Sequence, residues 1–200
     1  MIGIVAYEAG NIASVSNALG NLGVPFVVAD DIDRLSQCDG IILPGVGAAP
    51  GAMEALARRN LIHFLRDYSR PLLGICLGMQ LLFDSSEEGS TTCIGIIEGS
   101  VRAMNNDVAK VPHMGWKRVD HRADFPLALT LPKGAYFYFA HSYYAPVVPP
   151  TRATAECGIT FSAAIQKGNF FGVQYHPEKS GRDGLTVLKN FISICSSSRR

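Results

Sequence analysis

Short apolar runs alternate with stretches of helical periodicity through the first half of the chain, and this alternation constrains the fold more than any other feature. Helical spacing is clearest after Asn11, where Ile12, Val15 and Leu19 recur before Gly23. The apolar runs cover residues 2–7, 25–30, 39–47 and 71–76, and helices are predicted over 11–23, 52–68 and 77–83. Continuously apolar strands that alternate with helices indicate a parallel sheet covered on both faces.

The second half of the chain has a different pattern, with shorter runs separated by turns. These runs cover residues 96–104, 116–121, 135–146, 151–157, 161–168 and 169–176, and a closing helix is predicted at about 184–195. We find no internal repeat, no linker and no second catalytic region. The prediction is one α/β domain spanning 1–200, with a mostly parallel central sheet flanked by helices and a second-half set of short, partly antiparallel strands.

Composition excludes several classes of function. The chain has 200 residues, 48% of them hydrophobic, and a net charge of +1, so we expect a folded protein without affinity for nucleic acid or membranes. It starts without a secretion signal, which predicts a cytoplasmic protein. The five cysteines are scattered without zinc-type spacing, and we expect no metal and no cofactor; they are Cys38, Cys76, Cys93, Cys157 and Cys195.

One of these cysteines differs from the rest in its surroundings. Cys76 ends an apolar run and lies between Gly74 and Gly78, ahead of a predicted helix. Gly-x-Cys-x-Gly between a strand and a helix is the thiol form of the nucleophile elbow, in which glycines permit a sharp turn and close packing. A helix N-terminus also favours the thiolate. The pattern occurs in ordinary protein cores too. By itself it therefore favours a catalytic nucleophile and a buried core cysteine equally.

A thiol nucleophile needs a base and a group that orients the base. His176 follows an apolar strand, and Pro177 keeps the chain extended, so Glu178 projects to the same side as the imidazole. We therefore predict His176 as the base and Glu178 as its orienting acid, with His113 and His141 as the next candidates for the base.

An oxyanion formed during acyl transfer needs amide donors. The first is expected from Leu77, the residue after the nucleophile. The second is expected from Val46, at a strand end flanked by Gly45 and Gly47. Because a glycine lets the adjoining peptide rotate, Gly45 and Val46 are suited to a switch that completes the oxyanion hole only when required. An ordinary strand-to-helix turn is the alternative interpretation of this segment.

Three motifs in this order and over this length resemble the class I (triad) glutamine amidotransferases: Gly-Ile-Cys-Leu-Gly-Met-Gln, Pro-Gly-Val-Gly and Tyr-His-Pro-Glu-Lys-Ser. Residues 112–116, Pro-His-Met-Gly-Trp, and residues 141–144, His-Ser-Tyr-Tyr, narrow the resemblance to the glutaminase subunits of imidazole glycerol phosphate synthases, which act in histidine biosynthesis. The match covers essentially the whole chain.

The resemblance implies a Cys76–His176–Glu178 triad and a glutamyl thioester. It implies that L-glutamine is the substrate and that a (β/α)₈ cyclase subunit is the partner, which receives ammonia. It further implies glutamine-binding roles for Gly47, Gln80 and Glu88. The positions that it implies at the partner interface or its gate are Gly45, Asn11, Trp116, His141, Tyr143 and Lys179.

Some positions depart from the family pattern. Ala6 and Glu8 stand where Asp and Gly are usual, and Lys117 stands where Asn commonly follows Gly-Trp. These departures bear on partner docking. The alternatives left open are a glutaminase that serves anthranilate, purine, pyrimidine or pyridoxal phosphate synthesis, and a cysteine peptidase or esterase. An intact triad disfavours a further alternative, a catalytically silent regulatory subunit.

Overall fold

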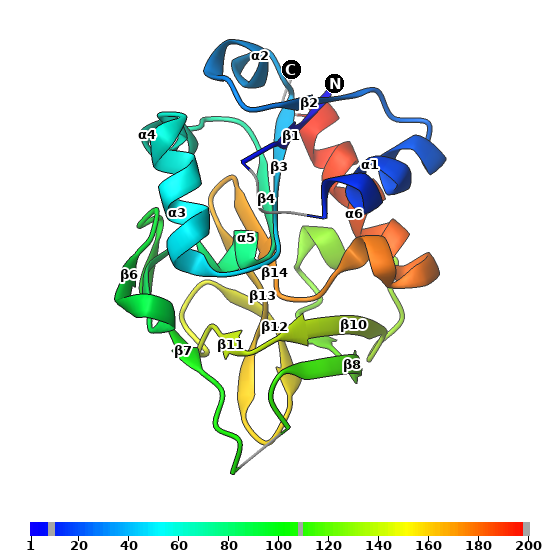
Figure 1. Cartoon of the computed structure of the whole chain (residues 1–200). Helices are drawn as coiled ribbons and strands as arrows, with labels where there is room; N and C mark the ends of the chain where they lie inside the picture. The colour runs from blue at the N-terminus through cyan, green and yellow to red at the C-terminus, as the bar shows by residue number, and fades with distance from the viewer. Residues whose placement is uncertain (8–10, 108–109, 198–200) are drawn as a thin grey trace.

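The computed structural model describes residues 1–7, 11–107 and 110–197. An eight-stranded sheet runs through the molecule in the order β2-β1-β3-β4-β14-β13-β12-β9 (Figure 1). Its first five strands are parallel. Four come from the first half, as the alternation predicted: β2 (Phe26–Ala29), β1 (Ile2–Val5), β3 (Gly40–Gly45) and β4 (Leu72–Cys76). The fifth, β14 (Phe170–Val173), comes from the second half. The remaining three are antiparallel: β13 (Thr160–Lys167), β12 (Thr151–Glu156) and β9 (Asp120–His121).

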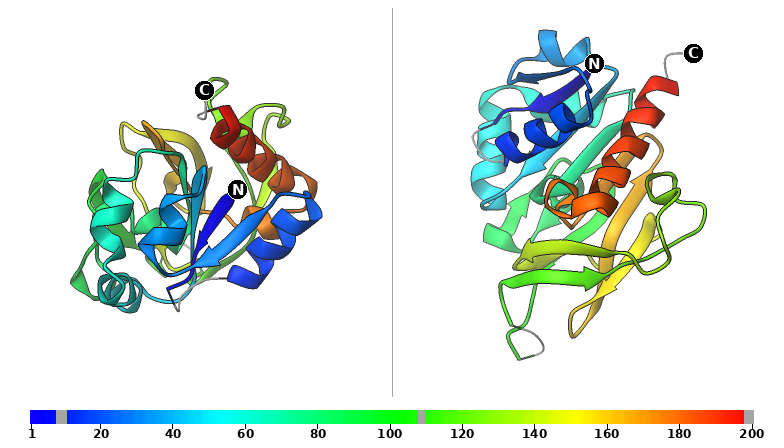
Figure 2. Two further views of the ribbon diagram at one scale, coloured as in Figure 1. Left: turned by 90° about the horizontal axis from the view of Figure 1, so that it is seen from above. Right: turned by 90° about the vertical axis from the view of Figure 1, so that its right-hand side faces the viewer.

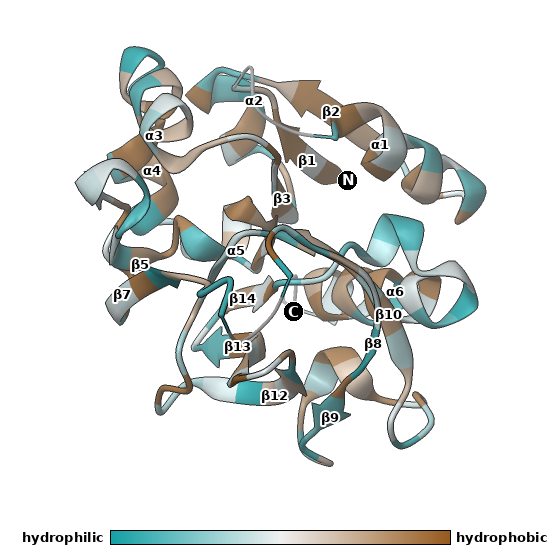
Figure 3. Ribbon diagram, turned by 60° about the horizontal axis from the view of Figure 1, so that its bottom comes forward, coloured by the Kyte–Doolittle hydropathy of each residue, from teal (hydrophilic) through white to brown (hydrophobic). Residues whose placement is uncertain are grey.

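Helices cover both faces of the parallel part, as Figure 2 shows from two further directions. One face carries α1 (Ile12–Asn21) and α6 (Gly181–Ser197), and the other carries α3 (Ala49–Arg58) and α4 (Leu61–Arg66). Each face has its own buried cluster of apolar side chains. In Figure 3 the strands β1 and β2 are mostly brown, while α6 shows both brown and teal, as expected for a helix with one buried face.

Two smaller sheets from the middle of the chain lie beside the carboxyl ends of the parallel strands. One has four strands in the order β11 (Tyr143–Tyr144), β7 (Ile97–Ala103), β5 (Phe83–Ser86) and β6 (Thr91–Thr92). The other pairs β8 (His113–Arg118) with β10 (Tyr136–His141). Short 3₁₀ turns are η1 (Glu88–Ser90), η2 (Pro126–Ala128) and η3 (Pro177–Lys179). Among the described residues, no helix is long and apolar enough to cross a membrane.

Two helix predictions were wrong in extent. The segment 52–68 forms two helices, because Asn60 adopts a left-handed conformation with φ 56° that ends α3 and begins α4. The segment 77–83 is helical only in α5 (Leu77–Gln80), and Phe83 begins a strand. A short apolar run has no periodicity that separates helix from strand. One helix, α2 (Ile32–Ser36), was not predicted.

Three glycines allow α5 to pack directly on strands β3 and β4. A Cβ atom added to Gly78 falls 1.9 Å from the Leu43 carbonyl oxygen. Atoms added to Gly45 and Gly74 fall 2.5 Å from the Gly78 nitrogen and 2.6 Å from the Gly78 carbonyl group. These separations are shorter than any contact that a real side chain makes, so backbone atoms occupy the space that Cβ atoms would need. The turn after β4 therefore depends on the absence of side chains at these three positions.

The packing makes a prediction about stability. Gly78→Ala should lower the free energy of unfolding in urea by at least about 2 kcal/mol, because the new methyl group overpacks rigid backbone. The matched control is Gly20→Ala in α1, where an added Cβ meets nothing within 4 Å. That change should raise stability by about 0.5–1 kcal/mol, since Gly is unfavourable inside a helix. Equal stability of Gly78→Ala and the unmodified chain would contradict this account.

Candidate active site

Cys76 is the last residue of β4 and immediately precedes α5, as the elbow motif predicted. Its backbone angles are φ 54° and ψ −110°, outside the regions that a non-glycine residue usually adopts. Such a conformation costs of order 1–3 kcal/mol and persists only where the surroundings enforce it. Here the glycine contacts enforce it. Because α5 is a single turn, its dipole at the thiol is weaker than that of the longer helix predicted.

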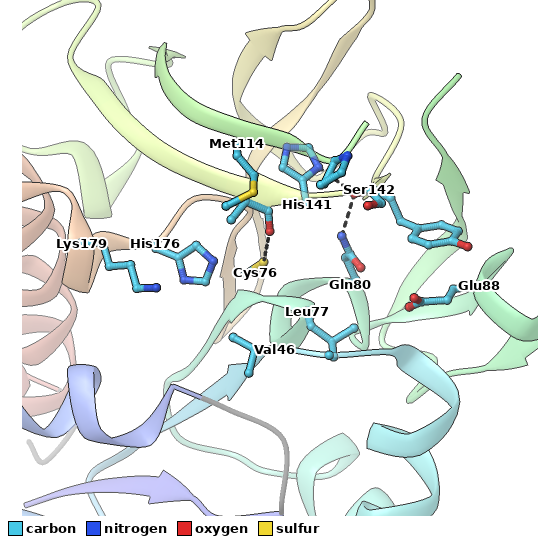
Figure 4. A pocket seen from close by; sticks show the side chains of 14 residues that line it. Val46, Cys76, Leu77, Gln80, Glu88, Met114, His141, Ser142, His176 and Lys179 are labelled. Atoms are coloured by element: carbon cyan, nitrogen blue, oxygen red, sulfur yellow. Dashed lines mark hydrogen bonds between the residues drawn. The ribbon is translucent and has the colours of Figure 1, made fainter. Parts of the chain in front are cut away.

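The Cys76 thiol faces a cavity of about 300 Å³ (Figure 4). Its Sγ atom lies 3.7 Å from the Ala140 carbonyl oxygen of β10, and the Gln174 side-chain nitrogen also lies 3.7 Å from Sγ. Gln174 is fully buried and accepts a hydrogen bond from Gln80 at 3.0 Å. Gln174 was not among the predicted site residues, although it stands two residues before His176 and so shares its side of an extended chain.

The predicted base and acid form a buried pair beside this cavity. His176 Nδ1 lies 2.8 Å from Glu178 Oε1, and the two side chains are only 3% and 1% exposed. Donation from Nδ1–H to the carboxylate leaves Nε2 for the thiol. Burial lowers the pKa of His176, but its interactions with Cys76 and with Glu178 outweigh burial and raise that pKa above its usual value. The imidazolium form is therefore favoured.

Strand β10 holds His176 in place. The His176 backbone N–H donates to the Tyr138 carbonyl at 2.9 Å. Ser180 completes the connection, because its hydroxyl donates to the His176 carbonyl at 2.7 Å and accepts from the Tyr138 N–H at 2.9 Å. Ser180 is buried, and it belongs to the motif that contains the base. Ser180 was not among the predicted site residues.

The two predicted oxyanion residues, Val46 and Leu77, both line the cavity. Gly45 pairs with Cys76 across β3 and β4, which places Val46 next to the thiol. Tyr7 supports this strand end from behind, since its hydroxyl donates to the Pro44 carbonyl at 2.5 Å. Burial and the nearby Cys76 raise the pKa of Tyr7, so the hydroxyl remains protonated.

The predicted glutamine-binding residues also line the cavity. Gly47 has φ 96°, which favours glycine. Gln80 is buried, and its amide donates to the Tyr143 carbonyl at 2.8 Å. The Glu88 carboxylate accepts from the Ala49 N–H at 2.7 Å. Figure 4 shows His176 and Lys179 on one side of Cys76, with Gln80 and Glu88 on the other.

The residues predicted at the partner interface or its gate fall into two groups. His141, Tyr143 and Lys179 line the cavity, as does Gly45's neighbour Val46. Asn11 and Trp116 do not line it. Trp116 is 52% exposed on β8 with its ring 6.2 Å from that of Tyr138, whereas Asn11 lies near Glu178. Of the departures from the family pattern, Glu8 lies outside the described residues.

No group of three or more histidine, cysteine or acidic side chains that could hold a metal ion occurs within residues 1–7, 11–107 and 110–197.

A family model for glutamine amidotransferase class I matches residues 4–195. The chain belongs to the class I glutamine amidotransferase family. This membership accounts for the order in which its three motifs occur.

Relatives within the class I glutamine amidotransferases share much of the sequence. The chain is 42% identical over 191 residues to the imidazole glycerol phosphate synthase subunit HisH of Pasteurella multocida, with 96% of each chain covered. It is 46% identical over 198 residues to the HisH subunit of Moorella thermoacetica, and the match covers 95% of this chain and 93% of the relative. The structure of PurLQS from Thermotoga maritima is similar in fold, with a TM-score of 0.74 at 20% identity. The match covers 96% of this chain and 97% of the matched chain.

A buried histidine of this amidotransferase makes stability depend on pH. His141 Nδ1 lies 2.8 Å from the Tyr143 carbonyl, and burial lowers the His141 pKa to about 4. Between pH 6.5 and 4 the unfolded chain therefore binds a proton that the folded chain does not, so stability falls as the pH falls through this window. At pH 5 the loss is about 2 kcal/mol, and above pH 6.5 it vanishes.

We predict that His141→Asn makes the decrease in unfolding free energy between pH 7 and pH 5 smaller by about 2 kcal/mol. The measurement is urea unfolding at the two pH values. His63→Asn is the control, because His63 is exposed on α4, and it should show the same decrease as the unmodified chain. An unchanged decrease in His141→Asn would show that His141 does not stay neutral in the folded chain.

Proposed function

We propose that this chain is the glutaminase subunit of an imidazole glycerol phosphate synthase. It hydrolyses L-glutamine to glutamate and ammonia, and a cyclase partner uses the ammonia to make imidazole glycerol phosphate and AICAR in histidine biosynthesis. The observation that carries the proposal is the strained Cys76 elbow facing the same cavity as His176, whose ring is hydrogen-bonded to the buried Glu178 behind it. The names of the relatives, which are HisH subunits of imidazole glycerol phosphate synthases, support the choice of synthase.

In the proposed mechanism, the thiol proton has already passed to His176 Nε2, and the resulting Cys76 thiolate attacks the carboxamide carbon of glutamine. The oxyanion accepts hydrogen bonds from the Val46 and Leu77 N–H groups. His176 then returns the proton to the amide nitrogen, the C–N bond breaks, and ammonia leaves a glutamyl thioester. Water attacks the thioester after losing a proton to His176, the sulfur leaves, and glutamate forms. Glu178 supports the positive charge on the imidazole throughout.

The positions of the polar groups support a single orientation for glutamine. Glu88 lies on the side of Cys76 away from His176, where its carboxylate suits the α-amino group of the substrate (Figure 4). Gln80 and Gly47 lie along the same cavity, where they would contact the bound amino acid. A cavity of about 300 Å³ suits one free amino acid better than a peptide, which favours a glutaminase over a peptidase.

We further propose that residues 1–200 form one glutaminase domain and that the cyclase is a separate polypeptide. The outer face of β8 and β10 carries exposed apolar side chains, namely Met114, Trp116 and Tyr136. Met114 also lines the cavity, so this face continues into the mouth of the site. A partner seated here would meet Trp116 and Lys179 and could receive ammonia directly. Free buried thiols and a thiol nucleophile fit a reducing compartment, and we place the enzyme in the cytoplasm.

The proposal predicts selective labelling. At pH 7, a glutamine-derived electrophile should label Cys76 and no other cysteine. Burial raises the pKa of Cys93 to about 11 and that of Cys195 to about 12, and it also raises that of Cys38, so these thiols are poor nucleophiles. Cys76→Ala should abolish glutamine hydrolysis, whereas Cys93→Ala should keep it. Labelled peptides are identified by mass spectrometry, and activity that survives in Cys76→Ala would refute the assignment.

A second prediction concerns the partner. Val46 is 40% exposed and follows Gly45, and we propose that their shared peptide turns to complete the oxyanion hole when the cyclase docks. One oxyanion donor is worth about 10²–10³ in rate. Glutamate release by the chain alone should therefore be at least about 10²-fold slower than release with the cyclase and its nucleotide substrate. Equal rates would contradict gating while leaving glutaminase activity intact.

A further inference from the structure

Asn11 occupies the N-cap position of α1 but does not cap the helix. Asn is among the best N-cap residues because its side-chain oxygen accepts from the first free N–H groups. Asp31 does this at the start of α2, where it accepts from the Arg34 N–H at 2.8 Å. The Asn11 side chain makes no such bond. Its amide nitrogen lies instead 3.5 Å from Glu178 Oε1.

Glu178 has few hydrogen-bond donors for a buried carboxylate. The side chain is 1% exposed, and Oε1 accepts from His176 Nδ1. The other oxygen, Oε2, is buried and has no hydrogen-bond partner among the residues that the structure describes. A carboxylate held by one strong hydrogen bond can rotate about that bond, so any further donor has a large effect on its orientation.

Helix α1 approaches Glu178 from the side opposite the active-site cavity. A second cavity, of about 270 Å³, is lined by Glu178, by Ser14 in the first turn of α1, and by Gly181 at the start of α6. Glu178 is not among the residues that line the cavity of Cys76. The first turn of α1 therefore forms the rear wall of the candidate catalytic pair, and Asn11 is the side chain of α1 whose bond reaches the carboxylate.

We propose that Asn11 is a positioning residue for Glu178: its amide holds the carboxylate in the orientation that accepts the His176 N–H, at the expense of capping α1. This inference rests on the proposed triad and adds a fourth member behind it. The separation of 3.5 Å is longer than the usual 2.7–3.2 Å, and catalytic hydrogen bonds often shorten when substrate binds. A small movement of α1 toward η3 is enough to tighten the bond.

The test uses substitutions that keep capping ability but remove the donor. Asp and Ser cap helices as well as Asn does. Asn11→Asp places a second carboxylate against Glu178, and Asn11→Ser shortens the side chain. The reaction followed is alkylation of Cys76 by iodoacetamide in the full chain at pH 7, quantified at Cys76 by mass spectrometry. This readout needs neither glutamine nor the cyclase.

We expect Asn11→Asp to slow Cys76 alkylation by about tenfold or more, the factor that one hydrogen bond to a charged group is worth. Asn11→Ser should slow it less. Melting temperatures should not fall, because Asp and Ser are favourable residues at the N-cap position and Asn11 makes no capping bond that could be lost. Asn60→Asp is the matched control, since Asn60 is the N-cap of α4 and also makes no capping bond. It should react at the rate of the unmodified chain.

A double-substitution cycle separates this inference from the proposed function. Glu178→Gln should slow alkylation by itself, and adding Asn11→Asp should slow it no further, because the two residues act through one contact. If Glu178→Gln leaves the rate unchanged, the proposed triad fails. If Glu178→Gln slows the reaction but Asn11→Asp does not, or if the two effects combine in full, the triad stands and the role of Asn11 is overturned.

Discussion

The contact between the backbone of α5 and strand β3 is the constraint on which the rest of the site depends. Gly78 lies so close to Leu43 that no side chain fits, and Gly45, at the end of the same strand, packs against the same turn. This contact enforces the strained angles of Cys76 and directs its thiol out of the sheet. It also brings the strand end that carries Val46 beside the thiol. One packing contact thus places both the nucleophile and a candidate oxyanion donor.

The second half of the chain supplies the candidate base, His176, and the strand that holds it. Strand β14 pairs with β4 in parallel, so both strands end at the same edge of the sheet. The segment that follows β14 therefore begins beside Cys76. Strand β10 then clamps His176 through Tyr138 and Ser180, and its Ala140 carbonyl lies against the thiol. The exposed face proposed for docking belongs to this same strand and its neighbour β8. A partner that shifts β10 would therefore move the base and the surroundings of the nucleophile together.

Much of this arrangement could be predicted from local patterns. The parallel strands, the elbow at Cys76 and the approach of Glu178 to His176 follow from apolar runs, glycine spacing and the geometry of extended chain. The break at Asn60 and the shortness of α5 could not, because apolar residues continue past the end of each helix. Gln174 and Ser180 were missed for another reason. Buried polar residues receive their roles from partners distant in sequence, and Gln174 meets Cys76 across 98 residues.

The buried polar groups around Cys76 form one connected set rather than separate contacts. Gln80 joins the Tyr143 carbonyl to Gln174, whose amide reaches the thiol. On the other side, His176 interacts with the thiol through charge and with Glu178 through a hydrogen bond. Polar groups in a dry interior are costly unless every member is paired, so such a set tolerates few alternative arrangements. The loosest member is Glu178, which retains an unpartnered oxygen within the described part of the chain. Glu178 lies where α1 meets η3. A small shift at this junction therefore has the largest effect on the orientation of His176.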